Sequence, residues 1–383
     1  MNPPGSSSIP SPPRAAYVHV PFCRHRCAYC NFTVVAGRGD LIQRYFQALD
    51  VELESLEEPR EIDTLYIGGG TPTELGAEPL EHLLDRLNHW FPVAENSEVT
   101  VEANPDGFSV ELAQRLVRAG VNRISLGVQS FQTTKLKQLD RQHGAEDSRR
   151  AVEIAASNFD NVSLDLIFAA PEETLAMWQE DLNVAIDLGP RHISTYGLTI
   201  EKGTLFWNAR LRGELRETTD SIQADMYVRA LDSLESAGFE HYEVSNLAQP
   251  GFRSRHNQTY WNGQPFWAFG PGAANYLDGR RSTNHRSTST YIQRLLSGRS
   301  AVVTSEKLSP ENSAREHLVL GLRRLEGIVL SEFSRQTGYK LDELVGETIE
   351  NFVLHGWLIR QPNRVRLTRR GLLISDSLWA ELL

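Results

Sequence analysis

The feature that most constrains the fold of this chain is a regular alternation of short β-like runs with amphipathic helical stretches from Ala15 onward. Strands are expected at residues 16–20, 64–69, 98–103, 123–128, 162–168, 192–200 and 239–245. Helices are expected between them, at residues 41–56, 79–91, 110–120, 146–159 and 177–189. This spacing predicts an α/β fold with a parallel sheet, either doubly wound or closed as a barrel. In both architectures, ligands bind at the carboxyl ends of the strands.

The two ends of the chain differ from this pattern. The first residues are rich in Pro and Ser, carry a single charge and lack the apolar stretch of a secretory signal. After residue 280, helical patterns lead into a hairpin-like stretch with a polar turn at Gln361 to Asn363. We therefore expect a disordered tail, an α/β part, and a small domain of helices and a hairpin that is winged-helix-like, at residues 1–14, 15–280 and 281–383.

Three cysteines, Cys23, Cys27 and Cys30, lie within eight residues of one another in a loop just past the first expected strand. Three thiolates on one short loop can hold three irons of a [4Fe–4S] cluster and leave the fourth iron for another ligand. A zinc site is the alternative, although zinc normally takes four protein ligands, or three and a water. His25 lies between the cysteines, but the curvature that gathers the thiolates is expected to aim it elsewhere.

Composition indicates the cellular compartment and excludes some kinds of binding partner. The chain has no other cysteine. An odd number of cysteines close together indicates metal binding in a reducing compartment rather than a disulfide framework. We therefore expect a cytoplasmic protein. No apolar run approaches the roughly 20 residues of a membrane helix. The net charge of −10 argues against a general affinity for nucleic acid, which requires a basic face.

The spacing Cys-x3-Cys-x2-Cys, with Tyr29 just before the third cysteine, resembles the signature of the radical S-adenosylmethionine (SAM) superfamily. The resemblance implies a partial (β/α)6 TIM-like barrel in which the amine and carboxylate of SAM chelate the open iron. In that superfamily the reduced cluster gives one electron to the sulfonium and releases a 5′-deoxyadenosyl radical.

Glycine and polar residues follow the next expected strands. Gly-Gly-Gly-Thr-Pro at 68–72 lets the backbone approach a ligand closely, although the same letters could form a simple turn. A single acid on a strand is more often solvated or ion-paired than functional, but several polar groups around one rim indicate a site. The resemblance assigns SAM contacts to Tyr17, Tyr29, Gly69, Gly70, Thr71, Glu102, Gln129, Arg141 and Asp165.

A closer resemblance is to the coproporphyrinogen III oxidase-like branch, which includes the oxygen-independent oxidases and the HemW-type heme chaperones. YVHVPFC, YIGGGTPT, RISLGVQSF, LDRQH and DLIFAAP match that branch in order across most of residues 15–280. Two features differ from the oxidase. Phe32 stands where the oxidase carries a further cysteine, and only 22 residues precede Cys23, where the oxidase has a long arm.

Residues 255–261, RHNQTYW, are similar to the His-Asn-x-x-Tyr-Trp segment of HemW-type proteins. The resemblance implies heme contacts for His256, Tyr260 and Trp261, with the histidine as an axial ligand and the aromatic rings as flat apolar surface. Residue chemistry alone favours another interpretation, in which the rings are core and His256 forms a hydrogen bond to a loop carbonyl. Both interpretations stay open.

Three functions follow from these features. The resemblance favours a heme chaperone that binds heme, passes it to an acceptor protein, and carries the cluster with exchangeable SAM and an electron donor as a further partner. The alternative is an oxygen-independent coproporphyrinogen III oxidase, whose adenosyl radical abstracts hydrogen from propionate side chains. A radical SAM enzyme that modifies tRNA is disfavoured by the acidic charge and the lack of an obvious basic RNA-binding module.

Overall fold

The computed structural model describes residues 12–383, so residues 1–11 of the predicted tail lie outside the described residues. Arg14 was predicted to belong to that tail, and this is wrong. Its guanidinium lies 2.7 Å from both Glu61 and Asp63, at the start of a central strand. The ordered chain therefore begins before residue 15.

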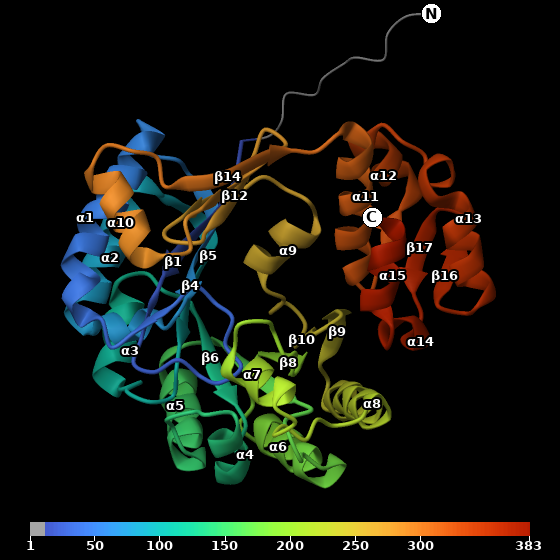
Figure 1. Cartoon of the computed structure of the whole chain (residues 1–383), viewed down its shortest axis with the longest axis horizontal. Helices are drawn as coiled ribbons and strands as arrows, with labels where there is room; N and C mark the ends of the chain where they lie inside the picture. The colour runs from blue at the N-terminus through green and yellow to red at the C-terminus, as the bar shows by residue number, and fades with distance from the viewer. Residues whose placement is uncertain (1–11) are drawn as a thin grey trace, which may run out of the picture.

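The centre of the molecule is a nine-stranded sheet in the order β11-β1-β4-β5-β6-β7-β8-β10-β9 (Figure 1). Six consecutive parallel strands form its central part: β1 (Ala15–Val20), β4 (Ile62–Gly69), β5 (Val93–Ala103), β6 (Arg123–Gln129), β7 (Asn161–Phe168) and β8 (His192–Gly197). The helices between and after them are α1 (Ile42–Leu53), α2 (Ala77–Trp90), α3 (Val110–Arg118), α4 (Thr133–Gln138), α5 (Ala145–Asn158), α6 (Leu175–Asp187), α7 (Leu205–Leu211) and α8 (Asp220–Ser236). The predicted α/β fold with a six-stranded partial barrel is confirmed.

The parallel strands place apolar and polar side chains on opposite faces. In β1, Ala16, Val18 and Val20 are fully buried in the main hydrophobic cluster, which also contains the apolar residues of α1. The side chains between them, Tyr17 and His19, contact each other instead. The same alternation runs through β4 to β8, because successive side chains of a strand point to opposite faces. The helix-facing side is therefore apolar, and the inner side is polar.

Shorter elements extend the sheet at both edges. β9 (Glu240–Glu243) and β10 (Asn246–Ala248) continue it beyond β8 in antiparallel pairing, so the strand predicted at 239–245 is divided into two. β11 (Trp267–Phe269) pairs in parallel with β1 at the other edge. In the chain, α9 (Arg255–Trp261) lies between β10 and β11. It contains the predicted heme segment, and its N-cap is Ser254.

The boundary predicted after residue 280 falls inside a strand. β12 (Ala274–Leu277), β13 (Arg280–Asn284) and β14 (Val302–Lys307) form an antiparallel sheet, and α10 (Thr288–Leu296) packs on α1. The C-terminal domain begins only with α11 (Pro310–Arg323), beyond that sheet (Figure 1). It continues with β15 (Ile328–Val329), α12 (Leu330–Thr337), α13 (Leu341–Leu354), β16 (Leu358–Gln361), β17 (Arg364–Leu367), α14 (Arg369–Leu372) and α15 (Ser375–Leu382).

This C-terminal order of elements confirms the helical, winged-helix-like domain with a hairpin. β16 and β17 pair antiparallel, with the turn between Gln361 and Arg364, and β15 adds a third strand. The domain is tied to the barrel by Arg323, whose guanidinium lies 2.6 Å from the buried Glu243. Within residues 12–383, no helix combines the length and the apolar character that crossing a membrane requires.

Candidate active site

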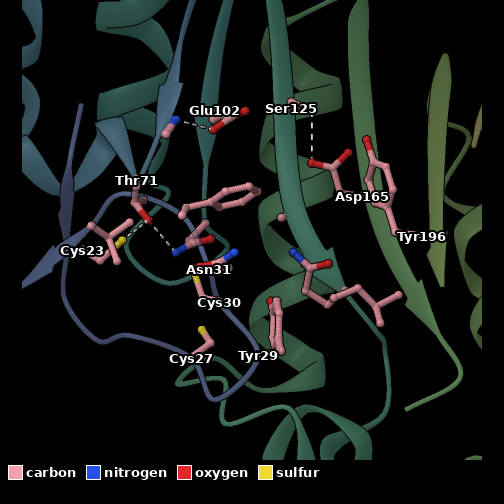
Figure 2. Close-up of a pocket in the computed structure, with 18 of the residues that line it drawn as sticks. Cys23, Cys27, Tyr29, Cys30, Asn31, Thr71, Glu102, Ser125, Asp165 and Tyr196 are labelled. Atoms are coloured by element: carbon pink, nitrogen blue, oxygen red, sulfur yellow. Dashed lines mark hydrogen bonds between the residues drawn. The ribbon is translucent and has the colours of Figure 1, made fainter. Parts of the chain in front are cut away.

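A cavity of about 420 Å³ lies at the carboxyl ends of the parallel strands, as expected for this architecture (Figure 2). All three cysteines line it. So do eight of the nine residues to which the resemblance assigns SAM contacts: Tyr29, Gly69, Gly70, Thr71, Glu102, Gln129, Arg141 and Asp165. The ninth, Tyr17, and the predicted heme residues His256, Tyr260 and Trp261 do not line it.

The cysteine loop starts on the short strand β2 (Phe22–Cys23), which pairs with β3 (Val35–Ala36) and so closes the loop on itself. Within the loop, Cys30 N donates to Cys27 O over 3.1 Å. The three thiols form no disulfide and are half-buried. Burial raises the pKa of Cys23 to about 12, and it also raises the pKa of Cys30. Burial thus favours the neutral thiol at Cys23 and Cys30, and a cationic partner would favour their thiolates.

The loop fits a cubane cluster better than a single ion. In the part of the chain that the structure describes, no three His, Cys, Asp or Glu side chains are grouped to hold one metal ion. A cubane requires less convergence, since each thiolate binds a different iron. His25 also lines the cavity, but its Nε2 lies 2.8 Å from Asp140 Oδ2.

The segment from Gly69 to Thr71 is held against the cysteine loop. Gly70 N donates to Val20 O, and Thr71 N donates to Phe22 O, each over 2.8 Å. A Cβ on Gly70 would lie 2.6 Å from the Phe22 carbonyl oxygen, so only glycine fits there. Thr71 Oγ1 lies 3.6 Å from Cys23 Sγ, which joins the second strand end to the first cysteine.

Two carboxylates stand on neighbouring parts of the cavity wall. Glu102 accepts hydrogen bonds from Tyr66 OH and Gly69 N, each over 2.8 Å, and Asp165 accepts one from Ser125 Oγ over 3.3 Å (Figure 2). Burial raises the pKa of Glu102 to about 7 and also raises that of Asp165. Partly buried acceptors of this kind suit the hydroxyl groups of a ligand.

Gln129 and Arg141 complete the wall nearest the cysteines. Gln129 ends β6 with a φ of 65°, a conformation that is uncommon for residues other than glycine and turns the chain sharply at the rim. Arg141 donates to Asn104 Oδ1 and to Gly127 O, each over 2.7 Å, and its Nη1 lies 3.6 Å from Cys27 Sγ. The guanidinium thus places a fixed positive charge beside the cluster loop.

Tyr17 supports the site from behind rather than lining it. Its hydroxyl lies 2.9 Å from His19 Nδ1, and His19 Nε2 lies 2.7 Å from Thr33 O in the cysteine loop. Burial lowers the pKa of His19 to about 4, so the ring is neutral and one nitrogen donates while the other accepts. Tyr17 therefore holds the cluster loop in place through His19.

The structure does not bring the predicted heme residues into the cavity. His256 is 1% exposed, and its two ring nitrogens lie 2.9 Å from Thr64 Oγ1 and 2.7 Å from Tyr260 OH. Trp261 packs on Tyr242 in a separate small cluster. His256 thus has no ring nitrogen available in this arrangement, and the heme role assigned by resemblance stays a prediction.

Sequence reasoning missed several lining residues: Tyr66, Asn104, Arg123, Ser125, Ser194 and Tyr196. Asn104 joins two predicted residues, because its Nδ2 donates to Thr71 Oγ1 over 2.8 Å while its Oδ1 accepts from Arg141. Its position just after a strand end was the available signal. Arg123 begins its strand and therefore gave no such signal.

Comparison with known proteins identifies the family. Residues 17–185 match the model of the radical SAM superfamily, and residues 308–374 match that of the HemN C-terminal domain. The structure is similar to coproporphyrinogen III oxidase (HemN) from Escherichia coli, with a TM-score of 0.85 at 19% identity over 97% of this chain and 90% of that one.

Curated relatives are more similar in sequence. The heme chaperone HemW of Lactococcus lactis is 36% identical over 97% of both chains, and that of Bacillus subtilis is 34% identical over 97% of this chain and 99% of its own. HemW of Escherichia coli is 33% identical over 96% of this chain and 97% of its own. The chain therefore belongs to the HemW family of heme chaperones, within the radical SAM superfamily.

Proposed function

We propose that this protein binds heme and passes it to an acceptor protein, and that it holds a [4Fe–4S] cluster with exchangeable SAM. The observation that carries the proposal is Phe32. This side chain is 68% exposed and lies at the cavity, two residues after the third cysteine, where the oxidase carries a further cysteine. An exposed aromatic ring beside a cavity suits contact with a flat apolar ligand.

The chain offers a complete set of groups for the two cofactors. Cys23, Cys27 and Cys30 would hold the cluster, and Glu102 and Asp165 would accept hydrogen bonds from the ribose of SAM. When bound, the cofactors would supply one-electron cleavage of the sulfonium carbon–sulfur bond. The backbone at Gly69 to Thr71 and the guanidinium of Arg141 would orient the amino-acid end of SAM.

Heme would dock at the mouth of the cavity, against Phe32. Arg286 bonds to the loop on both sides of this ring, to Asn31 O and to Thr33 Oγ1, and so presents the ring outward. Arg26 also lines the cavity and donates to Cys30 O. Two arginines beside an exposed ring match a ligand with an apolar face and anionic propionates.

Titration of the cluster-loaded protein with hemin, followed by Soret absorbance, tests this proposal. Phe32→Ser should lower heme affinity at least about tenfold, because burying a phenylalanine ring contributes about 1.5–3 kcal/mol. Leu354→Ser is the matched control, since Leu354 is 85% exposed on α13 in the C-terminal domain. His256→Gln tests the heme role that the resemblance assigns to this histidine: loss of heme binding in that variant alone would place the heme site at α9, and unchanged affinity would leave it at Phe32.

The second candidate function is coproporphyrinogen III oxidation, and the complete rim of polar groups around the cavity favours it. The anaerobically reconstituted protein should be supplied with coproporphyrinogen III, SAM and a reductant. Formation of the decarboxylated product would overturn the chaperone assignment. Absence of product together with stoichiometric heme binding would support it. Dithionite can replace the electron donor in this assay, so the donor need not be known.

A further inference from the structure

The cavity floor contains an arginine that the proposed function does not use. Arg123 lines the cavity and is 2% exposed. Among the described residues its Nε has no hydrogen-bond partner, and the ion pairs found there do not include it. Burying a cation that forms no ion pair is costly, which indicates that its charge acts on other groups of the site.

The register of the strands places this cation next to both cavity acids. Ser125 lies two residues further along β6, on the same face as Arg123. Ser125 is the register partner of Glu102 on β5, and it donates to Asp165 on β7. Arg123 therefore lies two residues before Ser125 on the strand between the two acids, on the face that carries Ser125.

We propose that Arg123 is a positioning residue whose charge favours the carboxylate forms of Glu102 and Asp165 while leaving their oxygens available to the hydroxyl groups of a ligand. A direct ion pair would occupy those oxygens. A cation one step away stabilises the negative charge through space instead, which is effective in a buried site. The ligand expected is SAM, bound through its ribose, so this part rests on the proposed function.

The electrostatics of the floor agree with this geometry. Burial raises the pKa of Glu102 and Asp165, and Arg123 acts on both in the opposite direction. Burial also keeps the nearby histidines neutral, with a lowered pKa for His256 and His192. The other titratable and charged groups that face the two acids are Tyr17, Tyr66, Arg141, Tyr196 and Tyr260. Of these only Arg141 is a cation, and it is already bonded at the cluster loop.

Infrared titration of the carboxyl groups tests the charge without any ligand. The protonated carboxyl bands of Glu102 and Asp165, assigned with Glu102→Gln and Asp165→Asn, should persist to a higher pH in Arg123→Met, by about one pH unit or more. Arg123→Lys should restore the original midpoint. Thr100→Val is the matched control: Thr100 is the register partner of Arg123, fully buried, and its hydroxyl has no partner in the described part of the chain. An unchanged midpoint in Arg123→Met would overturn the proposal.

Binding of S-adenosylhomocysteine tests the consequence. Affinity should fall as the pH drops through the titration of the carboxylates, and the fall should begin at a higher pH in Arg123→Met. At a pH below the carboxyl midpoints of both proteins, Arg123→Met should bind S-adenosylhomocysteine more weakly than the unmodified protein does. The difference should be about tenfold for each pH unit by which the substitution has raised the carboxyl midpoint. Arg123→Gln gives the same comparison if the methionine variant does not fold. If the unmodified protein does not bind S-adenosylhomocysteine, the proposed SAM site is overturned, whereas the infrared result still decides the role of Arg123. If the affinity of both proteins depends on pH in the same way, the proposed role of Arg123 is wrong.

Discussion

Lys135 on α4 lies in a buried cluster of charged side chains. It does not line the cavity, but removing its charge should lower the free energy of unfolding considerably. Its Nζ lies 2.6 Å from Glu173 Oε1 and 3.0 Å from Asp181 Oδ2, and all three side chains are 0% exposed. Glu173 also accepts a hydrogen bond from the backbone of the loop after β7, and Asp181 accepts two from the loop after β6. The cluster thus fixes the loops that follow β6 and β7, two strands whose ends line the cavity.

Lys135→Met removes the charge and keeps most of the side-chain volume. It leaves two buried carboxylates without their cation, and breaking a buried ion pair in this way costs about 3–5 kcal/mol. We therefore expect the free energy of unfolding, measured with urea at neutral pH, to fall by that amount. Lys137→Met on the same helix is the control, because Lys137 is exposed and its loss should cost no more than about 0.5 kcal/mol.

The pH dependence of this loss has a definite sign. Burial raises the pKa of Glu173, and Lys135 opposes that rise, so the variant should have a still higher pKa at this carboxyl. A carboxyl with a higher pKa in the folded than in the unfolded state favours folding as the pH falls. The deficit of the variant should therefore shrink from about pH 8 to pH 5. A loss below about 1 kcal/mol, or a deficit that does not change with pH, would refute a charged cluster.

Three further predictions concern the cluster, the rim and the buried histidines. Cys27→Ser should lose the iron content and the electron paramagnetic resonance signal of the reconstituted protein; retention of both would contradict the cluster site. Asn104→Ala should weaken binding of S-adenosylhomocysteine about tenfold in a calorimetric titration, because the side chains of Thr71 and Arg141 lose a shared partner. If affinity is unchanged, the two side chains hold their positions without it. Acidification from pH 7 to pH 5 should lower the free energy of unfolding by up to about 1.4 kcal/mol per pH unit for each buried histidine, since burial lowers the pKa below its usual value in His19, His143, His192, His241 and His256. These groups take up a proton on unfolding, whereas buried carboxyls with a raised pKa such as Glu102 act in the opposite direction. His192→Gln should therefore reduce the loss between pH 7 and pH 5, and an equal loss in that variant would show that His192 is not held neutral.

Much of the cavity could be predicted because its residues follow strands directly in sequence. In a parallel sheet all such ends meet at one edge, so Glu102 and Gln129 could be placed together without knowledge of their contacts. The cysteine loop was predictable for the same reason, since it follows β1 closely.

The contacts of His256 could not be predicted from the sequence. Its ring nitrogens pair with Thr64, which is 192 residues away, and with Tyr260, one helical turn further along α9. The short helix itself was not expected. The pattern His-Asn-x-x-Tyr-Trp gives the residue types, but it does not show whether their side chains point into the barrel or away from it. The boundary after residue 280 was misplaced for a related reason, because β13 gains its partners only from β12 and β14 in the folded chain.

The alternation within the strands carries information about the interior of the barrel. Parallel strands that are covered on both faces by apolar layers read as near-continuous apolar runs, in doubly wound sheets and in filled barrels alike. Here β6 and β7 instead alternate, with Arg123, Ser125 and Asp165 on one face and leucine, isoleucine or valine on the other. A parallel strand with one polar face requires something polar to enclose, and a barrel whose interior opens into a ligand cavity provides it. The same alternation places Arg123 on the inner face of β6, where it lines the cavity together with the two acids.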